Sequence, residues 1–138
     1  MRTSKIFVTV DVVLWRASVS GGHIVLIQRK NPPFENQWAL PGGFVDENED
    51  LPDAARRELL EETGIRVNHI EQLKAFGKPR RDPRGHMVSV AFLARMSDEN
   101  VQPQAADDAA DAKWFLVNDL PKLAFDHAEI ISFALTKT

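Results

Sequence analysis

The sequence contains no cysteine among its 138 residues. This absence excludes disulfides, iron–sulfur clusters, cysteine-ligated zinc and a catalytic thiol. Long hydrophobic runs are also missing, the longest being only a few residues, such as Ile24 to Ile27. A membrane-spanning helix needs about 20 apolar residues, so none is predicted. The first residues lead into alternating side chains and not into the apolar block of a signal peptide.

The charge of the chain is nearly balanced. There are 20 Asp and Glu residues against 17 Lys and Arg residues, which gives a formal net charge of −3. This balance argues against a protein dedicated to nucleic-acid binding, although it is compatible with a local basic patch. Hydrophobic residues are 43% and charged residues 27%, as in ordinary globular domains. We therefore expect one cytoplasmic domain over residues 1–138.

Hydrophobic patterns and turn residues predict an α/β fold. The ranges expected for strands are 6–15, 23–28, 38–40, 65–76, 87–95 and 112–117. The first two strands are joined by a Ser-Gly turn and should form a hairpin. Helices are expected over 51–63 and 124–135, with a basic, turn-rich segment at 77–86 and a polar, acidic loop at 97–112. This order predicts a mixed sheet between helices.

The helix over 51–63 has the strongest local signals. Asp50 is the expected N-cap, Pro52 lies in the first turn, and Gly64 supplies the stop. At about 100° per residue, Glu58 and Glu62 fall within roughly 20° of Leu51, on the apolar stripe of the helix.

Glu61 flanks the same stripe. Burying unpaired carboxylates is costly, and a hard divalent cation such as Mg²⁺ removes that cost. A metal site is therefore favoured over a solvated acidic face.

Two further residues of this region, Glu49 and Arg57, are expected to form an ion pair. Arg57 lies about 140° from Glu62 around the helix, so it does not share the face expected to hold a metal. Glu49 lies just before the helix. We expect a Glu49–Arg57 pair that ties the loop to the helix and fixes the orientation of the metal ligands.

The same residues form a recognisable pattern. Gly43 is followed after five residues by Glu49, and after seven more by the run Arg-Glu-Leu-Leu-Glu-Glu-Thr-Gly-Ile at 57–65. This resembles the complete 23-residue Nudix box, with every fixed position filled. The resemblance implies the Nudix-type α/β/α sandwich with a mixed β-sheet, over nearly the whole chain. It also implies hydrolysis of a nucleoside diphosphate linked to another group, with Mg²⁺ or Mn²⁺.

Roles for individual residues follow from the resemblance. The metal ligands it implies are Gly42, through its carbonyl, Glu58, Glu61 and Glu62, and the catalytic residues are Glu49, Arg57, Glu58 and Glu61. The family places its general base variably. Here Glu58, Glu61 and the loop acids Asp107 and Asp108 are all candidates, and their spacing does not decide between them.

Selectivity for a substrate must come from outside the box. The segment 78–86 carries four fixed positive charges and a histidine, and its arginines suit two-point recognition of phosphate. The alternative is a solvated hairpin loop. The runs 81–85 and 123–131 resemble the branch of Nudix proteins that act on ADP-ribose, which also includes ADP-ribose-sensing transcription regulators.

The candidate substrate-binding residues are Asp11, Arg29, Phe34, Arg81 and Arg84. Phe34 lies in a proline-rich loop and is a candidate to stack on adenine, whereas Trp38 is expected in the core. Asp11, inside an apolar strand, is either a satisfied core acid or a contact to ribose or adenine.

The last helix opens on two polar residues. Asp126 is expected to cap it, with His127 half exposed. The alternative for both is contact with substrate or with a metal-bound water.

The leading hypothesis is an ADP-ribose pyrophosphatase that releases AMP and ribose 5-phosphate. The alternatives are a pyrophosphatase for nucleoside triphosphates, oxidised or not, and a non-catalytic ADP-ribose sensor. The complete glutamate set argues against the sensor, because a sensor does not need all the metal ligands. A small nucleotide is the expected partner, nucleic acid and membrane are not, and a homodimer is left open.

Overall fold

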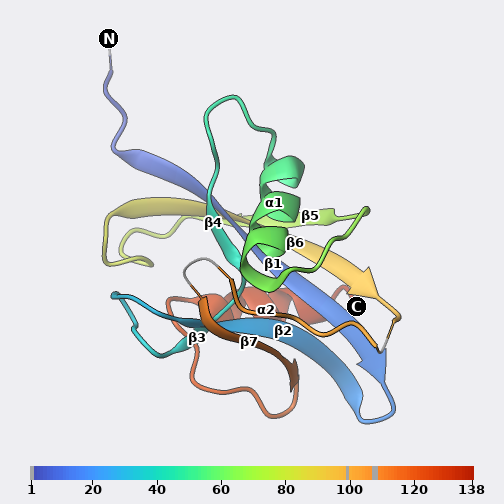
Figure 1. The fold of residues 1–138 in the computed structure, drawn as a ribbon. Coiled ribbons are helices and arrows are strands. Elements are labelled where there is room, and N and C mark those ends of the chain that lie inside the picture. The colour runs from blue at the N-terminus through green and yellow to red at the C-terminus, as the bar shows by residue number, and fades with distance from the viewer. Residues whose placement is uncertain (1, 99, 107–108) are drawn as a thin grey trace.

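The computed structural model describes residues 2–98, 100–106 and 109–138, which form a mixed sheet and two helices (Figure 1). In chain order the elements are β1 (Ile6–Ser18), β2 (Gly21–Arg29), β3 (Trp38–Ala39), β4 (Gly42–Phe44), α1 (Leu51–Thr63), β5 (Glu71–Phe76), β6 (His86–Met96), β7 (Ala109–Leu116) and α2 (His127–Leu135). The predicted α/β fold class is confirmed.

Strand β1 is the centre of the sheet. It pairs in parallel with β6 from Ile6–His86 to Arg16–Met96, and antiparallel with β2, which confirms the predicted hairpin. The main strand order is β3-β2-β1-β6-β5, with β4 paired to β1 and β7 paired to β2. Residues on β1, β4 and the segments that flank them are thereby brought close together.

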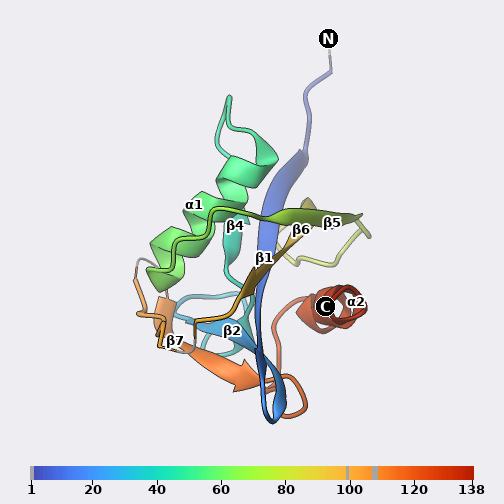
Figure 2. The same ribbon diagram turned by 90° about the vertical axis from the view of Figure 1, so that its right-hand side faces the viewer.

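The two helices cover opposite faces of this sheet (Figure 2). Because side chains alternate along a strand, neighbouring residues serve different layers. Val12 packs in the cluster that includes Leu59 of α1, whereas Val13 packs with Ile130 of α2. The helices thus each bury an apolar stripe on one face, which is the predicted α/β/α sandwich.

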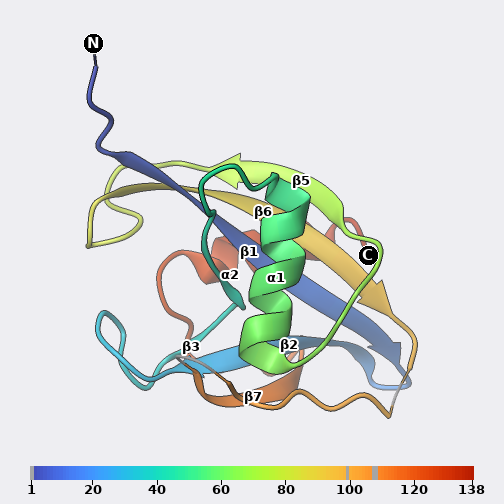
Figure 3. The ribbon, with the colours of Figure 1, turned by 45° about the horizontal axis from the view of Figure 1, so that its top comes forward.

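Helix α1 begins and ends where its sequence predicts. The Asp50 carboxylate accepts a hydrogen bond from the Leu51 N–H at 2.8 Å. Gly64 adopts a φ of 74°, a conformation that glycine reaches without steric cost, and its N–H donates to the Leu60 carbonyl. Strand β4 runs beside this helix (Figure 3), and its residue Gly43 lies against Glu58 while the Gly42 N–H donates to Glu62.

Several predicted boundaries are wrong. The strand expected over 65–76 is formed only from Glu71 onward. Ile65, Val67 and Ile70 pack against the α1 cluster without forming a strand, so their apolar character reflects burial and not sheet pairing. The last strand begins at Ala109, before the expected 112, and the last helix begins at His127, after the expected 124.

Candidate active site

A polar cavity of about 410 Å³ opens between β1, β4, α1 and the loops that precede β6 and α2. Acidic and basic side chains share its wall. The acidic residues are Asp11, Asp46, Glu58, Glu62 and Asp82, and the basic residues are Arg29, Lys30, Arg81 and Arg84. A wall with both signs of charge suits a ligand that is itself anionic but brings a cation with it.

Two glutamates of α1 face this cavity from the buried side of the helix. The side chain of Glu58 is only 13% exposed. Burial raises its pKa above the ordinary value, against the opposing effect of Arg57. Burial likewise raises the pKa of Glu62 to about 8, although the Gly42 N–H donates to its Oε1 at 2.7 Å. The negative charge of Glu58 raises the pKa of Glu62 further.

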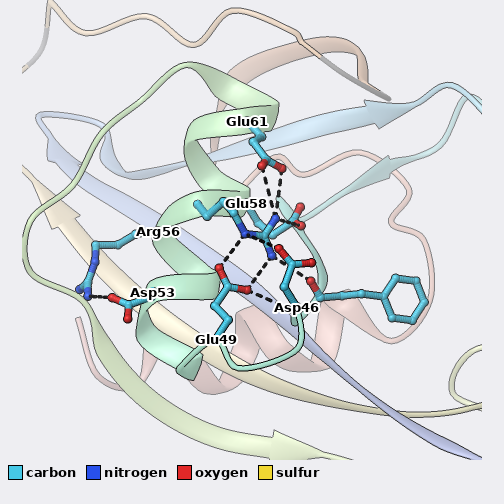
Figure 4. A network of polar contacts seen from close by, with 8 residues as sticks. Asp46, Glu49, Asp53, Arg56, Glu58 and Glu61 are labelled. Atoms are coloured by element: carbon cyan, nitrogen blue, oxygen red, sulfur yellow. Dashed lines mark hydrogen bonds and ion pairs between the residues drawn. The ribbon is translucent and has the colours of Figure 1, made fainter.

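The acidic residues Glu49, Glu58 and Glu61 lie in one network of polar contacts (Figure 4), and each forms an ion pair with Arg57. The Nε and Nη2 of Arg57 donate to the two oxygens of Glu49 at 2.7 and 2.8 Å, so the expected Glu49–Arg57 pair is present. Its Nη1 lies 2.8 Å from Glu58 and 3.2 Å from Glu61. The hydrogen bond from Arg57 lowers the pKa of Glu49 to about 2. Arg57, held in place by Glu49, therefore orients the Glu58 carboxylate.

Glu61 stands apart from the other two glutamates. Its side chain is 43% exposed, pairs with Arg57 and is not part of the cavity wall. Within the described residues, no three acidic or histidine side chains gather closely enough to form a ready ligand set. Glu58 and Glu62 nevertheless fit a hard divalent cation, because both are oxygen donors that burial makes costly to ionise alone.

The glycines of β4 explain how these carboxylates approach the backbone. A Cβ atom at Gly43 would lie 2.6 to 2.8 Å from the Glu58 carboxylate group. A Cβ atom at Gly42 would lie 2.1 Å from the Val10 carbonyl oxygen and 2.6 Å from Asp11 Oδ1. No other residue type fits at either position without displacing one of these groups.

The basic segment is divided between two surroundings. Lys78 and Arg80 are exposed and do not belong to the cavity wall that the described residues form. Arg81 and Arg84 do line the cavity, but each already has an acidic partner. Arg81 pairs with Asp126, and Arg84 pairs with Asp82 at 2.7 Å. The segment is therefore not a wholly solvated loop, and two of its four cations, Arg81 and Arg84, are already paired with carboxylates.

The expectations for the start of α2 are wrong in two respects. Asp126 precedes the helix, but its side chain makes no capping hydrogen bond and binds Arg81 instead. His127 is 4% exposed and not half exposed. Its Nδ1 accepts the Leu40 N–H at 3.0 Å, and its Nε2 lies 3.4 Å from Asp11 Oδ1. Asp11 also accepts a hydrogen bond from Ser89, so it is a satisfied buried acid at the cavity wall.

Aromatic side chains line the cavity, but Phe34, the candidate from the sequence, is not among them. Phe34 packs edge-on against Phe125 with ring centroids 4.7 Å apart, and it is Phe125 that lines the cavity. Phe44 lines it as well. Trp38 is partly buried and packs against the hydrophobic core, in agreement with the expected core role. Phe44 directly follows the Gly-Gly pair, which was the available signal for placing it at the site.

Comparison with known families and proteins agrees with this geometry. The model of the NUDIX domain matches residues 5–133. The chain belongs to the Nudix family. No helix among the described residues of this Nudix chain is long and apolar enough to cross a membrane. Of the candidate general bases, Glu58 and Glu61 are described, whereas Asp107 and Asp108 lie outside the described residues.

The Nudix relatives include an enzyme and a transcriptional repressor. The chain is 46% identical over 108 residues to the ADP-ribose pyrophosphatase of Methanocaldococcus jannaschii, covering 78% of this chain and 63% of that protein. It is 37% identical over 133 residues to the ADPR responsive transcriptional repressor NtrR of Acinetobacter baylyi, covering 94% of this chain and 53% of that one. The chain thus spans about half to two thirds of the length of these relatives.

Among solved structures, the NUDIX domain of Shewanella oneidensis NrtR, complexed with ADP ribose, superposes with a TM-score of 0.90. It is 36% identical, and the match covers 98% of this chain and 90% of that one. A MutT/nudix family protein from Enterococcus faecalis also gives 0.90, at 38% identity, covering 99% of this chain and 63% of that one. The whole Nudix sandwich, and not only the box, is therefore shared with these proteins.

Proposed function

We propose that this Nudix domain hydrolyses the diphosphate bond of ADP-ribose to AMP and ribose 5-phosphate, with Mg²⁺ or Mn²⁺ as its cofactor. The observation that carries the proposal is the cavity wall, where the buried pair Glu58 and Glu62 faces the same space as Arg81 and Arg84. The similarity to an ADP-ribose pyrophosphatase supports the choice of substrate.

Glu58 and Glu62 would hold the cation, with Glu61 and the Gly42 carbonyl as the further ligands that the family resemblance implies. Bound Mg²⁺ or Mn²⁺ would neutralise the diphosphate charge and promote ionisation of the attacking water. Arg57 contacts Glu58 and Glu61 at once, so it orients both carboxylates and stabilises their charged forms. Glu49 in turn keeps Arg57 in place by binding two of its nitrogens.

The reaction itself needs few protein groups. The oxygen of water attacks one phosphorus of the diphosphate, and the bond from that phosphorus to the bridging oxygen breaks. A carboxylate takes the proton from the water, and Glu58 and Glu61 are the candidates among the described residues. Arg81, Arg84 and Arg29 supply positive charge where the diphosphate would lie. Asp11 at the same wall is the candidate contact to a substrate hydroxyl, because each carboxylate oxygen can accept a further hydrogen bond beside its contact to Ser89 or His127.

An ADP-ribose sensor is the second candidate function. It is favoured by the similarity to a transcriptional repressor responsive to ADPR, and by the NrtR NUDIX domain complexed with ADP ribose. The two functions share a ligand and differ in turnover.

A substrate panel with Mg²⁺ tests the proposal. It contains ADP-ribose, NAD-type dinucleotides, sugar nucleotides and nucleoside triphosphates, and its products are resolved by chromatography. Preferred conversion of ADP-ribose to AMP and ribose 5-phosphate is the expected result. Pyrophosphate release from triphosphates would overturn the substrate assignment. Binding of ADP-ribose without turnover of any substrate would establish the sensor instead.

A further inference from the structure

The imidazole of His127 connects helix α2 to a segment 87 residues away in the sequence. The Leu40 N–H donates to its Nδ1 at 3.0 Å in a buried hydrogen bond. Because Nδ1 accepts, the neutral ring carries its hydrogen on Nε2, which lies 3.4 Å from Asp11 Oδ1. Both nitrogens therefore face groups of the protein, and neither is left to act on substrate as an acid, a base or a ligand.

Leu40 begins the turn that leads into the cavity. The next residue, Pro41, has a fixed φ, and its carbonyl accepts the Val12 N–H at 2.8 Å. Gly42 follows, and its N–H donates to Glu62 Oε1 at 2.7 Å. The backbone position of Leu40 is thus transmitted over two residues, through a stiff turn, to the carboxylate of Glu62.

The second nitrogen of His127 acts on the same turn from the other side. Asp11 pairs with Gly42 in the β1–β4 register, and its Oδ1 lies 2.6 Å from the position that a Cβ of residue 42 would take. Ser89 donates to the other oxygen of Asp11, so His127 and Ser89 together fix the carboxylate that packs on Gly42. One imidazole therefore touches both the start of the turn and the strand residue opposite its end.

We infer that His127 is a positioning residue, which sets the backbone of Leu40 to Gly42 and thereby the orientation of Glu62. The Leu40 hydrogen bond is the main connection, because it is shorter than the Asp11 contact and reaches the turn directly. The kinetic part of this inference rests on the proposed function. The structural part concerns the metal-free protein and does not depend on any substrate.

Three substitutions separate the two connections. The amide oxygen of asparagine is as many bonds from Cα as Nδ1, so His127→Asn keeps an acceptor for Leu40 and loses the group facing Asp11. The amide nitrogen of glutamine is as many bonds from Cα as Nε2, so His127→Gln keeps the group facing Asp11. His127→Ala removes both. Ser132→Ala, an exposed change on the same helix, is the matched control.

The first measurement is the amide spectrum of each metal-free variant by NMR. We expect His127→Ala and His127→Gln to displace the Gly42 amide resonance and to speed hydrogen exchange at Leu40. His127→Asn should stay close to the wild type, as should Ser132→Ala. A folded His127→Ala or His127→Gln protein with an unchanged Gly42 resonance would overturn the inference. So would displacement of equal size in the Asn and Gln variants.

The second measurement is Mn²⁺ affinity by calorimetry, followed by kcat and KM on ADP-ribose. Residues that orient metal ligands typically contribute about 10- to 100-fold to affinity or turnover, and we expect a loss of that size in the Gln and Ala variants, with KM little changed. His127→Asn should recover most of it. If the wild type does not hydrolyse ADP-ribose, the proposed function fails, while the Gly42 resonance and Mn²⁺ affinity still decide the role of His127.

Discussion

The guanidinium of Arg81 binds the carboxylate of Asp126 through two nitrogens, in an ion pair whose side chains are only 5% and 15% exposed. The partners are 45 residues apart in the sequence. The pair joins the basic segment before β6 to the start of α2, and Arg81 also lines the cavity. One residue therefore holds a loop in place and lends its charge to the site.

Removing one partner of this buried pair should destabilise the protein. Arg81→Ala leaves the Asp126 carboxylate buried without its counter-charge, and such changes cost about 3 to 5 kcal/mol. Urea unfolding would measure the loss. Lys78→Ala, in the exposed part of the same segment, should change the free energy of unfolding by less than about 0.5 kcal/mol. Equal stability of the two variants would show that the Arg81–Asp126 pair contributes nothing.

Arg84 should affect substrate binding, and its removal should also lower stability because the side chain of its partner Asp82 is only 4% exposed. The side chain of Arg84 is 40% exposed and pairs with Asp82. Its guanidinium lies 5.7 Å from the ring of Phe44 and 5.5 Å from that of Phe125, at the cavity rim. Loss of one charged contact to a phosphate corresponds to roughly a tenfold change, so Arg84→Ala should raise KM for ADP-ribose by about tenfold.

Steady-state kinetics on several substrates would test the assignment of Arg84. The rise in KM should be smaller for dinucleotides that are poor substrates. Arg84→Lys keeps the charge but not the planar group, so it should give an intermediate KM. An equal loss of activity on all substrates would instead indicate that Arg84 maintains the shape of the loop.

Local features of the sequence were sufficient for α1 and its ends. Asp50 caps the helix through the N–H of the next residue, Leu51. Gly64 ends it through a hydrogen bond to Leu60, four residues earlier, so each signal lies within one turn of the helix end. The first part of the strand expected over 65–76 is not formed, because β-branched residues packed against the cluster beneath α1 give the same pattern as a buried strand. Burial alone does not distinguish a strand from an irregular buried segment. Whether a segment forms a strand depends on a pairing partner, which the arrangement of the whole sheet determines.

Prediction of the site divides in the same way. The carboxylates on the inner stripe of α1 follow from helix geometry, and Glu58 and Glu62 do line the cavity. The burial of His127 depends on Leu40 and Asp11, and the pairing of Arg81 depends on Asp126. These contacts join distant segments, and no local pattern specifies them. The presence of a charged residue in a predicted loop is therefore weak evidence that its side chain is exposed.

The stability of the metal-free protein should depend on pH through Glu62. Its pKa in the folded protein is about 8, against an ordinary value of 4.5, because burial disfavours the charged form. The folded state then holds this proton more tightly than the unfolded state. The stabilisation is complete below pH 4.5 and is lost as the pH rises towards 8.

Glu62→Gln cannot titrate at this position, so it isolates the effect. Measured with a chelator present, its free energy of unfolding should rise relative to that of the wild type between about pH 4.5 and pH 8. Chemical unfolding of both proteins at several pH values gives the comparison. Parallel curves over this interval would mean that Glu62 ionises in the folded protein as it does in water.

Gly43 offers the sharpest separation of activity from stability. A Cβ at this position would lie 2.6 Å from Glu58 Oε2 and 2.8 Å from Oε1. The atoms it meets are the end of a flexible side chain, so Gly43→Ala can be accommodated by moving the Glu58 carboxylate. The cost in stability should be about 1 kcal/mol, the usual size for a point substitution.

The carboxylate that moves, however, is the one proposed to hold the cation. Displacement of a ligand by about 1 Å can reduce turnover by about 100-fold, so kcat on ADP-ribose and Mn²⁺ affinity should both fall steeply in Gly43→Ala. Gly77→Ala is the control, because a Cβ there meets only Val88, at 3.3 Å and beyond. If Gly43→Ala retains full Mn²⁺ affinity while folded, Glu58 does not hold the metal in the conformation described, and the assignment of ligands must change.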